Sequence, residues 1–330
     1  MKLSLSQLKL YFPGLLIAII VAFAANFLGE HYGAPTMLFA LLLGMALNFL
    51  GEDEKVRPGI DFAAKTILRV GVALLGLRIA FSDIIELGWQ PVALLVLGVA
   101  STIAVGIAVA RLMDGSARFG TLTGGAVAIC GASAALALSA ILPHDDKLER
   151  NTVFTVVSVT TLSTLAMIIY PLVAEAMTMS DAEAGLFFGA TIHDVAQVVG
   201  AGFSVSEEAG NLATLTKLMR VALLVPVVLI VSMAFRARGA EKRSGQPLLP
   251  LFLVMFVAGV GVNSLHILPD MVTEGLTGLS RLCLITAIAA VGVKTQLRSV
   301  VEVGFQPVVL MLIETLWLAG LVLLCLPYLT

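Results

Sequence analysis

Residues 88–110 read GWQPVALLVLGVASTIAVGIAVA, and residues 304–328 read GFQPVVLMLIETLWLAGLVLLCLPY. Both stretches open on a Gly-aromatic-Gln-Pro-Val string and continue as a long apolar run. The first contains no charged residue, and the second contains only Glu314. About 20 apolar residues in a row are what a helix needs to cross a bilayer. These stretches therefore predict a membrane protein whose chain repeats itself.

The composition of the whole chain supports this prediction. Of its 330 residues, 59% are hydrophobic and only 13% are charged, and the mean hydropathy is +1.02. A soluble domain carries roughly 25% charged residues, so this chain lacks the polar surface that a soluble fold needs. Disordered, collagen-like, disulfide-stapled and ordinary cytosolic enzyme classes are excluded. The net charge of −2 offers no basic field for nucleic acid.

Eleven apolar windows are long enough to enter a bilayer. Six contain no charged residue: 10–29, 34–50, 88–110, 119–142, 151–174 and 248–267. Five contain one to four: 60–80, 184–205, 211–235, 271–293 and 304–328. Because a helix satisfies its own backbone hydrogen bonds in lipid, we expect an all-α polytopic membrane protein with about nine to eleven transmembrane segments. They would form a single domain over residues 1–330, and no cofactor or metal is predicted.

The positions of Lys and Arg indicate the orientation, because cytoplasmic loops are enriched in them. If the N-terminus is cytoplasmic and every window crosses the membrane, twelve Lys and Arg residues lie on the cytoplasmic side and three lie outside. The inside residues are Lys2, Lys9, Lys55, Arg57, Arg111, Arg118, Arg236, Arg238, Lys242, Arg243, Lys294 and Arg298, and the outside residues are Arg78, Lys147 and Arg150. We therefore expect a cytoplasmic N-terminus and a C-terminus on the outside.

The charged loop at 144–150 leaves two topologies open. If window 119–142 enters the membrane and returns, this loop becomes cytoplasmic. Window 184–205 must then re-enter from the opposite face, and the count becomes fourteen inside to one outside. Both windows are rich in glycine and small residues, as irregular backbone that lines a cavity requires. Re-entrant loops and broken crossing helices are both compatible with the sequence.

The chain contains an internal repeat, in which residues 35–110 match residues 250–326. When the sequence is aligned with itself 216 residues further on, the matches are Gly76-Leu77-Arg78 with Gly292-Val293-Lys294, Glu86 with Glu302, and 88–92 with 304–308. Upstream the offset is 215 residues, and the matches are Pro35 with Pro250, Gly44 with Gly259 and Asn48 with Asn263. The two copies are expected to cross the membrane in opposite directions. Inverted repeats are typical of secondary transporters. A duplication retained for packing alone is the alternative.

Two glycine-rich strings are candidates for a substrate site. Residues 124–134 read GGAVAICGASA and residues 189–200 read GATIHDVAQVVG, and a shift of 63 aligns Ile129 with Ile192. Glycine in mid-membrane can break a helix, and the freed amides and the positive end of a half-helix form an anion site. Close helix packing through small residues is the alternative. The predicted substrate-binding residues are Gly124, Gly125, Cys130, Gly131, Ser133 and Gln197.

His193 and Asp194 are candidates for ion coupling. A carboxylate in mid-membrane is costly and usually faces a cavity, and histidine can change its charge near neutral pH. We predict that this pair couples transport to protons or orients the substrate. A structural ion pair between Asp194 and Arg220 or Arg281 is the alternative.

Further charged residues lie within the windows. A cation-rich interior suits an anionic substrate, and we predict that Arg69, Arg220 and Arg281 bind it. Lys65 and Lys217 are interpreted as snorkelling to an interface. Glu314 is predicted to carry a proton, with a structural salt bridge as the alternative.

The strings ICGASA at 129–134 and IHDVAQVVGAG at 192–202, with GLR at 76–78, resemble the putative sulfate exporter family of bacterial inner-membrane proteins. The resemblance covers essentially the whole chain. It implies a place among the cation–proton antiporters and anion transporters, with discontinuous helices at mid-membrane, a mobile core and a scaffold panel. By the same analogy, a homodimer is possible.

The sequence thus predicts a proton- or sodium-coupled secondary transporter, an exporter of a small anion such as a sulfur oxyanion, sulfonate or carboxylate. A passive anion channel on the same scaffold is the alternative. The chain has no HExxH, GxSxG or closely spaced pair of buried acids, so an enzyme is not expected. The partners would be the anion, the coupling ion and the lipid bilayer.

Overall fold

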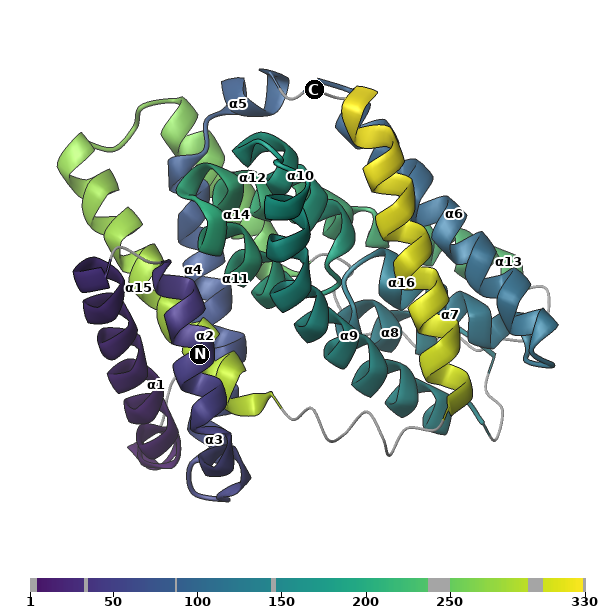
Figure 1. Ribbon diagram of the computed structural model, residues 1–330, viewed down its shortest axis with the longest axis horizontal. Coiled ribbons are helices and arrows are strands. Elements are labelled where there is room, and N and C mark those ends of the chain that lie inside the picture. The colour runs from purple at the N-terminus through teal and green to yellow at the C-terminus, as the bar shows by residue number, and fades with distance from the viewer. Residues whose placement is uncertain are drawn as a thin grey trace. The chain divides into compact units, whose positions relative to one another are not determined.

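The computed structural model describes residues 5–32, 35–86, 88–143, 147–236, 250–295 and 305–328 (Figure 1). Over these residues the secondary structure is helical and contains no strand, which confirms the predicted all-α class. Parts of three predicted features lie outside the described residues: residues 144–146 of the charged loop 144–150, residues 237–249 of the polar linker, and residues 296–304 of the second repeat copy, with Glu302 and Gly304.

The chain divides into two compact units, each built from three separate parts of the sequence. The first unit comprises residues 1–87, 199–211 and 251–296, and the second comprises residues 88–198, 212–250 and 297–330. In each copy of the repeat, the boundary between the two units falls shortly before the Gly-aromatic-Gln-Pro string. Both units therefore receive a portion of each copy.

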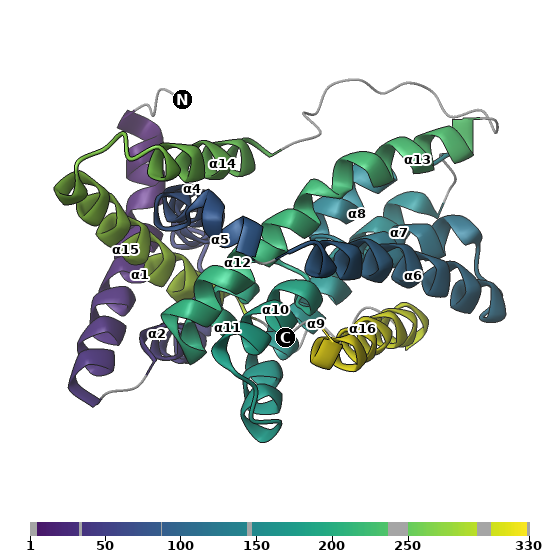
Figure 2. The ribbon, with the colours of Figure 1, turned by 90° about the horizontal axis from the view of Figure 1, so that it is seen from above.

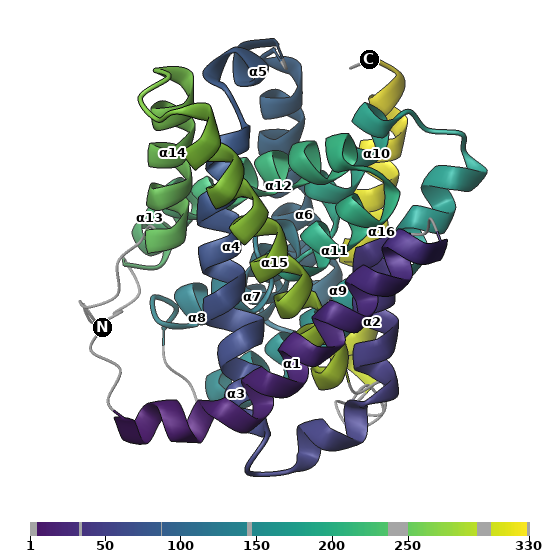
Figure 3. The same cartoon turned by 90° about the vertical axis from the view of Figure 1, so that its left-hand side faces the viewer.

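The first unit contains α1 (Leu5–Tyr32), α2 (Thr36–Ala46), α3 (Arg57–Phe62), α4 (Leu68–Leu75), α5 (Phe81–Glu86), α14 (Leu251–Ser264) and α15 (Asp270–Lys294). A π-helical turn, Ala63–Ile67, joins α3 to α4, and short 3-10 turns cover Asn48–Glu52 and Gly76–Arg78. Helix α15 lies at the centre of this unit, where it contacts α1, α2 and α4 (Figures 1 and 3).

The second unit contains α6 (Gln90–Leu112), α7 (Ala117–Ala128), α8 (Ala132–Ser139), α9 (Leu148–Ala176), α10 (Asp181–Thr191), α13 (Leu224–Arg236) and α16 (Phe305–Cys325). Helices α6, α7 and α16 pack against one another (Figure 2). Pro91 lies in the first turn of α6, where proline costs no hydrogen bond. Two further helices, α11 (Val195–Val205) and α12 (Glu207–Ala222), begin in one unit and end in the other.

In the part of the chain that the structure describes, six helices are long and apolar enough to cross a membrane. They cover Lys9–Tyr32, Gln90–Leu112, Leu148–Ala176, Glu207–Phe235, Met271–Lys294 and Pro307–Tyr328. The other predicted windows form short or interrupted helices within the described residues. The architecture is thus polytopic, and its interrupted helices coincide with the windows that carry glycine or charge.

Contacts inside the first unit follow the sequence repeat. Helix α2 approaches α15 at Gly44, where a Cβ atom would collide with the backbone of Ala289 and Gly292. Helix α14 approaches the end of α4 in the matching way, since Gly259 lies against the backbone of Ala73 and Gly76. The repeat pairs these residues with one another, so the same contact occurs twice with the copies exchanged. An internal two-fold axis would produce this arrangement.

The second unit contains one contact of the same kind. The Trp317 indole N–H donates to Ser101 Oγ at 3.2 Å, and these two positions are matched at the shift of 216. A residue can contact its own repeat mate only close to the symmetry axis. Helices α6 and α16 therefore cross near a symmetry axis of their own unit.

Candidate functional site

Helix α7 ends in the middle of its predicted window, and the chain turns back. The break covers residues 129–131, and Gly131 has φ +65°, a conformation that glycine adopts without strain. A Cβ on Gly125 would collide with the Leu138 side chain of α8. If α7 and α8 continued in one direction, these residues would be about 20 Å apart at 1.5 Å rise per residue. Helix α8 thus folds back against α7, which favours the re-entrant alternative for window 119–142.

The second central window is broken at residues 192–194, which the shift of 63 aligns with the break at 129–131. Helix α10 begins with a capping box between Ser180 and Glu183 and ends at Thr191. Residues 192–194 separate it from α11, whose amino end lies at Val195. The choice between a re-entrant and a crossing path for window 184–205 stays open, because α11 continues into the other unit.

The two helix breaks meet at a single side chain. Lys217 Nζ donates to the carbonyl of Ile129 at 2.7 Å and to the carbonyl of Ile192 at 2.9 Å. These are the two residues that the shift of 63 aligned. Lys217 is fully buried, so the interpretation that it snorkels to an interface is wrong. The reason is that two helix ends supply carbonyl oxygens which only an internal donor can reach.

Arg220, one turn further along α12, completes this arrangement. Its Nε donates to Ala128 O at 2.8 Å and its Nη2 to Val127 O at 2.9 Å, while Nη1 lies 3.2 Å from Gly189 O. The carboxyl ends of α7 and α10 carry unpaired carbonyls and partial negative charge. The two cations on α12 donate hydrogen bonds to these carbonyls and balance the partial negative charge. They also hold the two breaks side by side.

His193 lies inside the break after α10 and is fully buried. Its Nδ1 is 3.1 Å from Val127 O, and its Nε2 is 3.0 Å from Thr315 Oγ1. A carbonyl can only accept, so Nδ1 carries a proton. In the neutral ring Nε2 then accepts from the Thr315 hydroxyl. The imidazole therefore links α10, α7 and α16.

Glu314 precedes Thr315 on α16 and is also fully buried. Its Oε1 accepts from Thr123 Oγ1 of α7 at 2.7 Å. A Cβ on Gly106 would collide with Oε1, so glycine in α6 leaves the space for this carboxyl group. Among the described residues, Oε2 is buried and has no hydrogen-bond partner. One carboxyl oxygen is thus available for a proton or a cation.

Other predicted residues surround the breaks. Cys130 is buried at the turn, and Gln197 is buried with its Nε2 3.4 Å from Thr164 Oγ1. Asp194 is half-buried, and its backbone N–H donates to Ser163 Oγ at 3.0 Å. Ser133 is exposed in the first turn of α8. Their substrate contacts stay predictions.

The glycines differ from the expectation. Gly124 and Gly125 lie inside α7, where their amides belong to the helix, and Gly124 packs closely against the backbone of α6. The amide of Gly131 donates to Ala126 O at 2.8 Å. The alternative of close packing therefore describes these two α7 glycines, and the helix breaks only at residues 129–131. Ser133 and its neighbours at the start of α8 are better placed to offer amides.

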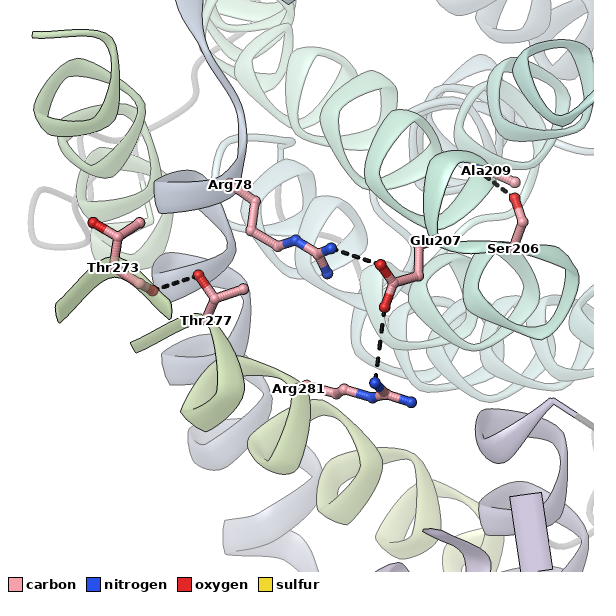
Figure 4. Close-up of polar contacts among 7 residues, drawn as sticks. All are labelled: Arg78, Ser206, Glu207, Ala209, Thr273, Thr277 and Arg281. Atoms are coloured by element: carbon pink, nitrogen blue, oxygen red, sulfur yellow. Dashed lines mark hydrogen bonds and ion pairs between the residues drawn. The ribbon is translucent and has the colours of Figure 1, made fainter. Parts of the chain in front are cut away.

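Two predicted arginines lie in the first unit. Arg69 is exposed, with its guanidinium 6.0 Å from the centre of the Phe252 ring. Arg281 contacts Glu207 at 3.8 Å, and Glu207 also pairs with Arg78 at 2.7 Å (Figure 4). Arg69 and Arg281 thus belong to the first unit and Arg220 to the second, and their substrate contacts stay predictions.

Several site residues were not predicted. Thr123 and Thr315 look like ordinary helix residues in the sequence, although Thr315 stands beside Glu314. Lys217 was visible as an i, i+3 neighbour of Arg220, but the sequence gave no sign of its carbonyl partners. The sequence marks Arg78 as part of the repeated Gly-Leu-Arg motif and as a basic residue outside the membrane, and it gives no sign of a pairing with Glu207.

These features define the protein as an all-α, multi-pass membrane protein with two helix breaks that meet on buried cations. Residues 13–311 match the family described as Conserved hypothetical protein 698, and the chain belongs to that family. It is the family that the strings at 129–134 and 192–202 resemble.

Several curated relatives support this assignment. A UPF0324 membrane protein of Chlorobaculum tepidum is 56% identical over 95% of this chain and 88% of its own length. One from Rhizobium meliloti is 52% identical over 99% and 96%. The UPF0324 membrane protein TauZ of Paracoccus denitrificans is 52% identical over 93% and 92%.

Proposed function

We propose that this protein is a secondary transporter, an exporter of a small anion, in the bacterial inner membrane. The observation that carries the proposal is the meeting of two helix breaks on Lys217 inside an apolar unit. Interrupted helices in membranes typically surround a substrate or ion site. We propose no catalytic activity for it.

Electrostatics favour an anion. The buried cations Lys217 and Arg220 neutralise the carboxyl ends of α7 and α10, which would otherwise repel a negative ligand. The amino ends of α8 and α11 then supply positive partial charge at the same breaks. An anion held at the first turn of α8, beside Ser133, meets N–H donors at low desolvation cost.

Glu314 is the residue that we propose for ion coupling, with His193 and Asp194 as its partners. Its unpaired Oε2 can take a proton or bind a cation without breaking a hydrogen bond in the described structure. Thr315, the next residue, bonds to His193 at the helix break. A change of charge on Glu314 is thereby connected through one residue to the proposed anion site.

The experiment is flux in proteoliposomes, using sulfate, methanesulfonate and acetate with an imposed pH gradient. We expect Glu314→Gln to abolish the acceleration by the gradient while exchange of anion across the membrane continues. Asp194→Asn and His193→Gln should weaken the acceleration of flux by the pH gradient. Thr160→Val, which removes an exposed hydroxyl from α9, is the matched control. Unchanged gradient dependence in Glu314→Gln would refute the coupling role, and absence of trans-acceleration in the unsubstituted protein would indicate a channel.

A further inference from the structure

The first unit contains a pocket that shares no residue with the helix breaks. Its volume is about 400 Å³. Arg78 and Arg281 line it together with Glu30 and Glu207, and Leu75, Phe203 and Leu284 add apolar walls. A concave site with a few converging charges and apolar walls is the usual form of a small-molecule site.

The two arginines already hold a carboxylate that belongs to the protein. Figure 4 shows their side chains approaching Glu207 from two sides, with Arg78 Nη2 2.7 Å from Oε2 and Arg281 Nη1 3.8 Å from Oε1. The Arg281 and Glu207 side chains are 54% and 57% exposed. The exposed Arg281–Glu207 pair contributes little to stability, whereas the Arg78 side chain is 25% exposed and hydrogen-bonded to Glu207. An external oxyanion that accepts the hydrogen bond from Arg78 can therefore replace the Glu207 carboxylate, because one oxyanion is exchanged for another.

The internal repeat provides a comparison within the same unit. Lys294, the repeat mate of Arg78, lines a second pocket and forms an ion pair with Asp61 of the adjoining helix. The repeat mate of Asp61 is Thr277, which lines the first pocket. The first pocket therefore lacks an acid at the position that matches Asp61. Its acids are Glu207, in the first turn of α12, and Glu30, near the end of α1, whose Oε1 accepts from Asn26 Nδ2 at 2.8 Å; both lie outside the repeat.

We infer that the Arg78–Arg281 pocket binds the anionic group of the transported compound, which displaces Glu207. The fork of a guanidinium matches the oxygens of a carboxylate or sulfonate. The apolar walls favour a small organic anion, a sulfonate or carboxylate with a short hydrocarbon body, over inorganic sulfate. This inference rests on the proposed transport function, for which it supplies the substrate class and an entry site.

Calorimetric titration of the full chain in lipid nanodiscs tests it, with propanesulfonate, propionate and sulfate as probes. We expect Arg78→Gln and Arg281→Gln to weaken propanesulfonate binding about tenfold or more, because each removes a charged partner. Glu207→Gln should tighten it several-fold, because the competing carboxylate is gone. Lys294→Gln, at the matched position of the second pocket, should leave it unchanged.

Unchanged binding in both arginine variants, or lost binding in a folded Glu207→Gln variant, would overturn the inference. Tighter binding of sulfate than of propanesulfonate would overturn the organic class. Arg281 is more than half exposed, so Arg281→Gln is expected to fold. It therefore tests the inference even if Arg78→Gln does not fold. Flux with an unchanged KM in the arginine variants would refute the pocket alone. Binding that follows the expected pattern without any flux would refute transport alone.

Discussion

Two lysines of this chain show how neighbouring carbonyls decide what a membrane charge does. Lys65 and Lys217 both stand within apolar windows, and snorkelling is a reasonable expectation for each. Lys65 is exposed, whereas Lys217 is fully buried against two carbonyls. Only Lys217 lies where helix ends present unpaired oxygens. Its charge is therefore part of the fold rather than of the surface.

This difference leads to a stability prediction. Lys217→Met leaves the carbonyls of Ile129 and Ile192 buried without their donor, and we expect the free energy of unfolding to fall by about 2–4 kcal/mol. Lys65→Met, the same substitution at an exposed site, should change it by less than about 0.5 kcal/mol. Denaturation of both variants in detergent micelles measures the effect. Equal losses would show that Lys217 is not the link between the breaks.

At the scale of elements, the hairpin of α7 and α8 is held by a close approach. Gly125 lets the Leu138 side chain lie directly on α7. The break itself uses Gly131, whose positive φ no branched residue adopts cheaply. Within the string 124–134, Gly131 thus allows the chain to turn, and Gly125 allows α8 to pack closely against α7.

The close approach can be tested with a pair of substitutions. Gly125→Val should destabilise the protein by about 1–3 kcal/mol, because the new side chain overlaps Leu138. Leu138→Ala in the same chain should recover part of this loss. Gly320→Val in α16, where a Cβ would have no neighbour within 4 Å, is the control. No recovery in the double variant, measured by thermal unfolding, would contradict the folded-back hairpin.

At the scale of the whole molecule, the return of α8 has a consequence for topology. If the hairpin re-enters the membrane as its fold-back indicates, both of its ends lie on one side, and we expect Arg118 and Lys147 to be cytoplasmic. Helix α9 is a candidate span of 29 residues, and we expect it to carry Thr178 to the outside. This assignment agrees with the fourteen-to-one count of basic residues.

Sidedness can be measured with single cysteines and an impermeant maleimide on intact cells. We expect Thr178→Cys to react from outside, and Arg118→Cys and Lys147→Cys to react only after the cells are opened. The unsubstituted protein, with its three native cysteines, gives the background. Labelling of Lys147→Cys from outside would restore the crossing path for window 119–142.

The sequence by itself determined the all-α membrane class, the repeat, the two windows that contain the helix breaks and the burial of Glu314. Each depends on local composition or on matched residues along the chain, which the linear pattern contains. Only the tertiary structure decided that Ile129 and Ile192 share Lys217, that Thr123 and Thr315 join Glu314 and His193 to the breaks, and that Arg78 and Arg281 flank Glu207. These contacts join residues distant along the chain, and their partners are mostly carbonyls or hydroxyls that no motif distinguishes. Hydrogen-bond geometry between packed helices therefore decides the site, and apolar patterning decides where the helices are.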